Sequence, residues 1–436
     1  MTETAEEVAI ASATGGASRV AAHAGITFAG LMAANVLNYV FYTLVSRSLG
    51  VEAYGAFSSL VAVVLILQAP ALMAQTVVAK LATDMAGDPN RLAGLVRGVE
   101  RVTLIVALAA GAGLDALSIP LAHFLHVDDP LLVTLAGACV CGALALPFLR
   151  GFLQGTSAFS AFSLSNVVEG LAKAVFAPVL GLAGGIRGAM GGLAIGLAVA
   201  ASYTFVAALP HRRGTPVHLS LRAVARSSAP VALAVVGITV LLLFDVVLAK
   251  RYLDAYAAGL YGAAALASRA LYAIVAFVPT VLLPQAAQRV ANRERTRGLF
   301  GQALGLAALL CAGAIVLFAL FPRLVITTIA GKSFAPGAGL LVPYVYAIAM
   351  LSLANVTAMY NIARGRMRFV VPLLVVVVGE IVAIVVRHGS RVEFLQTIDV
   401  GHTLAFLAAA TALGGSTQST ESERSNRRAC AARSGG

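Results

Sequence analysis

Charge is scarce in this 436-residue sequence, in which Asp, Glu, Lys and Arg make up 11% of the residues. A typical soluble domain has about 25% charged residues. Hydrophobic residues account for 59% of the chain, and a soluble fold has too little polar surface to cover so much apolar material. The composition therefore excludes an ordinary soluble protein and predicts an all-α membrane protein that crosses the bilayer many times.

The sequence also lacks the usual marks of a disulfide, nucleotide or metal site. Three of the four cysteines lie inside apolar runs, which argues against a disulfide framework. No phosphate-binding loop is present, so we expect neither a built-in ATPase nor a cofactor. The pair His123 and His126 has no further ligand nearby, and we expect no metal there.

The formal net charge of +12 does not point to nucleic acid. Nucleic-acid-binding domains gather Lys and Arg on one face, whereas here they occupy short gaps between apolar runs. Such basic gaps are typical of loops held at an anionic cytoplasmic leaflet. We therefore expect membrane lipid as a neighbour and no nucleic-acid partner.

Twelve apolar runs approach the roughly 20 residues that a membrane-spanning helix needs. The first is too long for a signal-peptide core and is predicted to be retained. The last is short and carries a histidine near its start. The predicted spans are 24–45, 57–79, 102–122, 131–149, 161–182, 189–209, 229–249, 259–284, 299–321, 336–360, 369–386 and 398–413.

The distribution of basic residues orients these spans. With the N-terminus inside, 21 of the 31 Lys and Arg residues fall on the cytoplasmic side and 8 on the opposite side. Because basic residues concentrate on the cytoplasmic side of membrane proteins, this predicts a multi-pass protein of a bacterial cytoplasmic membrane with both termini inside.

The same pattern predicts the domain organisation. Two six-span lobes are joined by a cytoplasmic linker, and polar segments without apolar periodicity flank them. The predicted boundaries are 1–23 for a disordered N-terminus, 24–209 for the N-lobe, 210–228 for the linker, 229–413 for the C-lobe and 414–436 for a disordered tail.

The two halves resemble each other in sequence. Four ordered matches of Arg, Tyr, Pro and Gly recur at nearly constant separation: Arg47 with Arg251, Tyr54-Gly55 with Tyr261-Gly262, Pro70 with Pro279, and Gly155 with Gly365. Because six spans is an even number, both copies have the same orientation. Parallel repeats of this kind occur in transporters, whose site lies between the halves.

Charged residues inside the spans are the candidate site residues, because an intramembrane charge is costly and is usually functional. Asn166, Glu169 and Lys173 share one face of span 161–182. They form either an ion pair that fixes this span or a polar face on a central cavity.

Asp245 and Arg269 have no partner in their own spans. A structural bridge between them and a pair of substrate contacts are both possible. Glu380 is a secondary candidate that could lie closer to the interior of its lobe.

Several short motifs resemble polysaccharide flippases of the multidrug/oligosaccharidyl-lipid/polysaccharide exporter superfamily, over about residues 24 to 385. They are Arg47-Ser-Leu-Gly50 with Tyr54-Gly55, Gly151-x-x-Gln154-Gly155 with Phe159, Asn166-x-x-Glu169-x-x-x-Lys173, and Asp245 followed by Tyr252-Leu253, Gly259-x-Tyr261 and Pro284.

This resemblance implies a V-shaped, MATE-like transporter with twelve or more helices in two lobes. It also implies translocation of undecaprenyl-linked oligosaccharides, with cationic residues attracting the pyrophosphate and glycan. Lys173 and Arg269 are then the best cationic candidates, and Arg47 and Arg150 would lie at the mouths of the cavity. The chain departs from the family pattern after about Val386.

The sequence thus favours a lipid-linked glycan flippase working by alternating access, without enzymatic activity. A coupling cation, H⁺ or Na⁺, is possible, with Glu169 or Asp245 as a proton carrier. One alternative is a cation-coupled small-molecule or drug exporter of the same superfamily. Another is a membrane-embedded glycan ligase or acyltransferase, although no outer loop is long enough for an acceptor site.

Overall fold

The computed structural model describes residues 25, 29–212, 221–292, 294 and 296–413, and this part of the chain contains helices and no strands. The all-α prediction is confirmed. The predicted polar ends, 1–23 and 414–436, lie outside the described residues, as does part of the predicted linker, whose residues 221–228 already belong to a helix.

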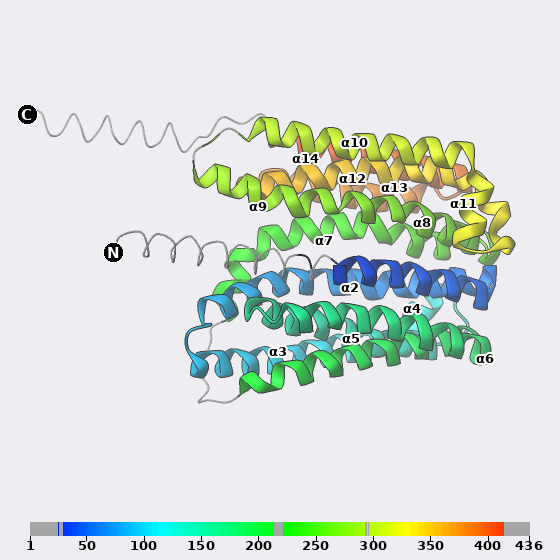
Figure 1. The fold of residues 1–436 in the computed structure, drawn as a ribbon. Coiled ribbons are helices and arrows are strands. Elements are labelled where there is room, and N and C mark those ends of the chain that lie inside the picture. Colours follow the sequence, from blue (N-terminus) through cyan, green and yellow to red (C-terminus); the bar gives the residue numbers. More distant parts are fainter. Residues whose placement is uncertain (1–24, 26–28, 213–220, 293, 295, 414–436) are drawn as a thin grey trace, which may run out of the picture.

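The chain forms two successive groups of helices, shown from blue to green and from green to red in Figure 1. The first group consists of the helix Ala29–Leu49, α2 (Val51–Asp84), α3 (Pro89–Ala116), α4 (Ser118–Phe124), α5 (Leu131–Gly155), α6 (Phe159–Ala208) and the short η1 (Leu209–Arg212). The second consists of α7 (Leu221–Tyr252), α8 (Ala255–Val275), α9 (Phe277–Ala291), α10 (Arg297–Leu320), α11 (Pro322–Ile329), η2 (Lys332–Leu340), α12 (Leu341–Ala363), α13 (Val370–Val386) and α14 (Arg391–Ala410).

Each of the twelve predicted spans corresponds to a described helix or to one half of α6. Eight helices are long and apolar enough to span a membrane, and the pair α3 and α4, which meet at 61°, makes a ninth if the two count as one span. The 50-residue α6 contains two predicted spans. The 17-residue α13 and the less apolar α14 complete the set, running alongside the other helices in Figure 1.

A tight reversal divides α6 into two antiparallel halves. Gly184 and Gly185 leave the helical conformation, and Gly185 has φ 57°, which favours glycine. Added methyl groups at Gly188, Gly192 and Gly196 would meet the backbone of the first half, between Lys173 and Leu180. The glycine stripe therefore lets two helix backbones touch directly, which is how small residues act in membrane helix packing.

Several predicted helix limits were wrong. The expected loop 80–101 shrinks to residues 85–88, because α2 and α3 continue as helices through their basic ends. The expected span 259–284 corresponds to the apolar stretch Ala255–Pro279, so it ends earlier than predicted, and a turn at Ala276 separates α8 from α9 within it. Pro279 explains the break, since proline has no N–H to donate to the carbonyl of Val275 one turn earlier.

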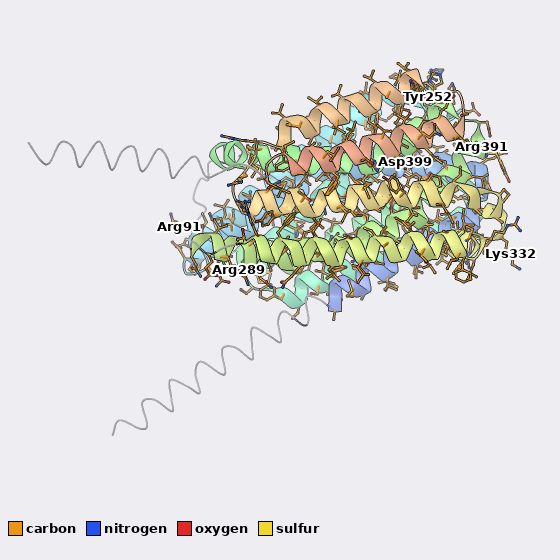
Figure 2. The ribbon with its side chains drawn as sticks, turned by 90° about the horizontal axis from the view of Figure 1, so that it is seen from above. Arg91, Tyr252, Arg289, Lys332, Arg391 and Asp399 are labelled. Atoms are coloured by element: carbon orange, nitrogen blue, oxygen red, sulfur yellow. The ribbon has the colours of Figure 1, made fainter. Side chains whose placement is uncertain are left out.

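The two ends of the molecule are distinguished by the turns they carry. Figure 2 shows Arg91 and Arg289 at one end and Tyr252, Lys332 and Arg391 at the other. We call them the Arg91 end and the Arg391 end. The breaks after Leu49 and Tyr252 and before Arg391 lie at the Arg391 end, and the turn between α2 and α3 lies at the Arg91 end.

Hydrogen bonds join the two helix groups at the Arg391 end. Arg47 Nη2 donates to the carbonyl of Thr328 (2.8 Å), and Ser46 Oγ donates to the carbonyl of Ala330 (3.0 Å). Arg251 Nη1 lies 2.8 Å from His126 Nε2. These contacts connect the first group to α11 and α7, which closes the molecule at this end.

Helices α2 and α8, which the repeat relates to each other, also meet at the Arg391 end. An added methyl group at Gly55 would lie 2.8 Å from the backbone nitrogen of Gly259. The rings of Tyr54 and Phe334 meet edge to face with centroids 5.6 Å apart. Only glycine permits such close backbone contact, and the aromatic pair fills the space beside it.

Candidate substrate cavity

A cavity of about 410 Å³ lies between the two helix groups. The first group contributes residues of the Ala29–Leu49 helix, α2, α5 and α6, and the second contributes residues of α7 and α8. Its polar and charged lining residues are Asn35, Asn38, Tyr39, Tyr42, Tyr54, Ser58, Gln68, Arg150, Asn166, Glu169, Lys173, Arg269 and Tyr272. The predicted candidates Asn166, Glu169, Lys173 and Arg269 therefore share one cavity.

A cluster of three charges forms the wall contributed by the first group. Glu169 lies between two cations: its Oε1 is 2.6 Å from Lys173 Nζ and its Oε2 is 2.8 Å from Arg150 Nη1. All three side chains are at most 15% exposed. One carboxylate thus balances two cations, and the cluster carries one uncompensated positive charge.

This geometry combines both interpretations of the Glu169–Lys173 spacing. The two residues form an ion pair one helical turn apart, and they also line the cavity. Lys173 Nζ additionally lies 5.7 Å from the centroid of the Phe41 ring, a distance at which an aromatic face attracts a cation.

The expectation that Arg150 lies at a mouth of the cavity was wrong. Arg150 belongs to α5, which continues beyond the predicted span end at residue 149, and it is buried in the wall. Besides the ion pair with Glu169, its Nε donates to Ser165 Oγ and its Nη2 to the Ser165 carbonyl, both at 2.9 Å. These three contacts replace the hydrogen bonds with water that the guanidinium loses on burial.

Asp245 and Arg269 form the bridge that was one of the two possibilities for them. Arg269 Nη2 lies 2.9 Å from Asp245 Oδ1. Asp245 Oδ2 accepts hydrogen bonds from the hydroxyls of Tyr261 (2.8 Å) and Tyr344. Asp245 is 1% exposed and lies behind Arg269, which is 18% exposed and reaches the cavity. Asp245 therefore holds Arg269 in place instead of lining the cavity itself.

The other two candidates lie elsewhere. Arg47 takes part in the closure of the Arg391 end, where its guanidinium donates a hydrogen bond to the carbonyl of Thr328, and it does not line the cavity. Glu380 is buried between α13 and α14, inside the second helix group, and does not line the cavity.

The cavity also has a neutral polar face, which the sequence pattern did not predict. Asn35, Asn38, Tyr39 and Tyr42 line it from the Ala29–Leu49 helix. Their spacing of three and four residues places them on one helical face. That spacing was a usable signal, but uncharged polar residues barely change the hydropathy of an apolar run.

The cavity therefore suits an anionic, hydrogen-bonding group. The cluster contributes a net charge of +1, and the Arg269 guanidinium, which is paired with Asp245 and 18% exposed, also reaches the cavity. Charges act more strongly here than in water because the surroundings are apolar. The amides and tyrosine hydroxyls supply neutral contacts for hydroxyl-rich ligands.

Solved structures that are similar to this chain include membrane transporters. An inward-facing multidrug resistance MATE family transporter of the MOP superfamily is similar with a TM-score of 0.67 and 14% identity, over 87% of this chain and 92% of the other. The lipid II flippase MurJ in an inward closed conformation gives 0.64 and 12%, over 89% and 87%. A eukaryotic MATE transporter gives 0.61 and 16%, over 93% and 97%.

The chain thus has the V-shaped fold of MATE-like membrane transporters, as the sequence predicted. Comparison with family models finds no match, and comparison with curated proteins finds none. These likenesses define the fold alone, so the function is inferred from the residues of the cavity.

Proposed function

We propose that the protein translocates a lipid-linked oligosaccharide of the undecaprenyl-pyrophosphate type across a bacterial cytoplasmic membrane by alternating access. The observation that carries this proposal is the net positive cluster of Arg150, Glu169 and Lys173 on the wall of the cavity. A pyrophosphate is anionic, and moving it through a bilayer requires groups that replace its water contacts.

The neutral lining supports the same cargo. Sugar hydroxyls both donate and accept hydrogen bonds, as do the tyrosine hydroxyls and amides of the cavity. The lipid chain needs no site in this polar space, because it can stay in the bilayer while the head group crosses.

Alternating access agrees with the closure of one end. At the Arg391 end, Ser46 and Arg47 of the first helix group donate hydrogen bonds to carbonyl groups at the end of α11 in the second group. The cavity lies deeper in the molecule than these hydrogen bonds. With the predicted orientation, the Arg391 end faces outward and the described conformation is closed to the outside. The two lobes, 24–209 and 229–413, would then rock about the contact of α2 with α7 and α8.

A cation-coupled exporter of small molecules is the second candidate. MATE transporters share the fold, and Glu169 and Asp245 are carboxylates in or beside the cavity. Both are already neutralised by cations in this geometry, which favours anionic over cationic cargo. We also propose that the protein is not an enzyme, since the charged residues described in the cavity are engaged in ion pairs.

The test is the charge of the cluster. Lys173→Ala leaves Arg150 and Glu169 as a neutral pair, and we expect flipping of a fluorescent polyprenyl-pyrophosphate disaccharide in proteoliposomes to fall about tenfold or more, since 1.4 kcal/mol of lost attraction gives that factor. The double variant Lys173→Ala/Glu169→Gln restores a net charge of +1 through Arg150 and should regain part of the rate.

The control is Lys332→Ala, which removes an exposed cation at the Arg391 end, away from the cavity. It should leave flipping unchanged. In cells, loss of drug tolerance in Lys173→Ala with intact surface glycan would instead support the exporter. Equal flipping by Lys173→Ala and the wild type would refute the proposed role of the cluster.

A further inference from the structure

The contacts that close the Arg391 end occur twice, once in each copy of the sequence repeat. Arg47, near the end of the first span, donates to the Thr328 carbonyl close to the end of α11. Its repeat counterpart Arg251, near the end of α7, lies against His126 in the turn after α4. Both short helices lie at this end in Figure 1. Each arginine therefore reaches from its own helix group to the short helix of the other group.

The turns that receive the two arginines also correspond to each other. The second residue after α4 is His126, with φ 49°, and the second residue after α11 is Gly331, with φ 111°. These two residues are 205 positions apart, and Arg47 and Arg251 are 204 apart. A methyl group added at Gly331 would lie 3.2 Å from Arg47 Cγ. Arg47 thus packs against Gly331 as Arg251 packs against His126.

A histidine is an unusual residue at this point of a turn. Two backbone hydrogen bonds close the turn as a Schellman motif, from the Val127 N–H to the Ala122 carbonyl (3.0 Å) and from the His126 N–H to the His123 carbonyl (3.3 Å). Glycine is the usual residue at the positive φ of this motif, and Gly331 takes that place in the other copy. The histidine adds what glycine lacks, a side chain that can accept a hydrogen bond.

The contact with Arg251 sets the charge of the His126 ring. Arg251 Nη1 lies 2.8 Å from Nε2 and 3.4 Å from Nδ1 of the ring. A guanidinium only donates hydrogen bonds, so Nε2 must accept and cannot carry a proton. An imidazolium has a proton on both nitrogens, so it could not accept this bond and would repel the guanidinium. The described contact therefore requires a neutral His126.

We propose that the Arg251–His126 contact makes closure of the Arg391 end sensitive to pH, and that this end opens when His126 takes up a proton. Histidine changes its charge between about pH 5 and 8. His126 is exposed, so it exchanges protons directly with the medium at this end, which the predicted orientation places outside the cell. The Arg47 contact uses a backbone carbonyl, which does not titrate, and it stays in place while acid weakens its counterpart.

Aromatic contacts hold Arg251 beside the histidine. Its guanidinium carbon lies 5.4 Å from the ring centroid of Phe124 and 6.0 Å from that of Tyr252, distances at which an aromatic ring attracts a cation. Phe124 belongs to α4, so turning away from His126 would also cost Arg251 this second contact with the first helix group. A proton on His126 therefore acts on the contact between the two helix groups.

The other charges at this end are engaged with one another. The titratable and charged side chains of the elements around His126 are Glu52 on α2, His123 on α4, Asp128 and Asp129 in the turn after α4, Arg187 on α6, Lys250, Arg251 and Tyr252 on α7, and His388 after α13. Asp129 pairs with Arg187. Asp128 and Glu52 are the carboxylates that act on Lys250. Arg251 is the charge in hydrogen-bond contact with the ring, so a proton on His126 meets another cation.

The test measures opening of the Arg391 end without any transport. In full-length protein lacking its four cysteines, spin labels are attached at Ala116→Cys on α3 and Lys332→Cys at the start of η2, two exposed positions in different helix groups. Distances between the labels at pH 8 and pH 5.5 give the ratio of open to closed molecules. We expect this ratio to rise about fivefold at pH 5.5, at the lower end of the usual coupling between two sites, because water and salt screen exposed charges.

Two substitutions of His126 separate charge from side-chain size. His126→Gln keeps an oxygen that can accept from Arg251 and does not titrate, so this variant should stay closed at both pH values. His126→Lys has a lasting positive charge and should be open at both. His123→Gln is the matched control, because it removes an exposed histidine one turn earlier and should respond to pH as the wild type does. A wild type that does not respond to pH would overturn the proposal, as would an equal response in His126→Gln.

The consequence for transport rests on the proposed alternating access and has its own readout. We expect acid to raise flipping of the disaccharide probe more in the wild type than in His126→Gln, because the closed end must open to release the head group. Opening that depends on His126, together with no flipping by any variant, would refute the proposed function and leave the pH-sensitive closure standing. Flipping without any such opening would refute the closure and leave the function.

Discussion

At the scale of single residues, the most demanding feature is the buried ion pair of Asp245 and Arg269. Asp245 is satisfied by one guanidinium and two tyrosine hydroxyls. Such a pair need not add much stability by itself, but removing one member leaves a buried charge without a partner, at a cost of about 3–5 kcal/mol.

Arg269→Ala is therefore expected to destabilise the protein by about 3–5 kcal/mol, measured by chemical unfolding of the purified protein in detergent. Arg269→Ala/Asp245→Asn should recover most of this loss, because the remaining amide is neutral. A double variant as unstable as Arg269→Ala would show that packing, and not charge, dominates here.

The residue scale also shows what sequence can reveal about the site. Glu169, Lys173 and Arg269 stand out because charge is rare inside apolar runs, and all three line the cavity. Arg150 was expected at a mouth of the cavity, and it follows a predicted span end. Its true role depends on Ser165 and Glu169, which reach it only after α5 and α6 pack together.

At the scale of elements, the hairpin of α6 depends on glycines, which leave no side chain between its two helical halves. Gly196 lies so close to Lys173 in the other half that an added methyl group would be 3.0 Å from its Cα. The same contact fixes the position of Lys173 along the cavity wall, so helix packing and cluster geometry are linked.

Gly196→Leu should separate the two halves of α6 and destabilise the protein by about 1–3 kcal/mol, the usual cost of overpacking. Gly191→Leu is the comparison, since an added group at Gly191 meets nothing within 4 Å. Thermal unfolding of both variants in the same detergent measures the difference, and equal stability would contradict direct backbone packing.

Helix number followed from the sequence more accurately than helix limits did. The twelve apolar runs each correspond to a described helix or to one half of α6, because hydrophobic length is set by the bilayer. Basic residues predict loops in this pattern, yet α2 and α3 continue through them, because Lys and Arg are good helix formers. The break at Ala276 needed the backbone effect of Pro279.

At the scale of the whole molecule, closure of the Arg391 end rests on a few close contacts between the helix groups. Where α2 meets α8, an added methyl group at Gly55 would lie 2.8 Å from the backbone nitrogen of Gly259, and one at Gly259 would overlap the carbonyl oxygen of Val51, so neither position has room for a side chain. Any larger residue there opposes the closed conformation without touching the cavity.

Gly55→Leu should shift the protein toward a conformation open at the Arg391 end. A cysteine placed at Ser58, which lines the cavity, reports this shift through its labelling rate from outside the cell, which should rise about tenfold for a change of 1.4 kcal/mol. Gly113→Leu has open space around it and should not alter labelling. An unchanged labelling rate in Gly55→Leu would show that the contact of Gly55 with Gly259 does not help to keep the Arg391 end closed.

The predicted orientation is tested in intact cells. In a variant lacking the four native cysteines, Gly389→Cys at the Arg391 end should react with a membrane-impermeant thiol reagent, whereas Gly87→Cys in the turn between α2 and α3 should not. The positive-inside pattern is the physical reason. Labelling of Gly87→Cys alone would show that the protein has the opposite orientation.

The cation cluster has a thermodynamic consequence. Arg150, Glu169 and Lys173 all belong to α5 and α6, so their mutual geometry is preserved when one helix group tilts against the other. Because the cluster has the same geometry in both conformations, it binds the cargo with the same affinity from either leaflet. Equal affinity speeds the equilibration of the cargo between the two leaflets but does not set the direction of net transport. Net transport to one leaflet must therefore come from removal of the cargo there or from a second, coupled gradient.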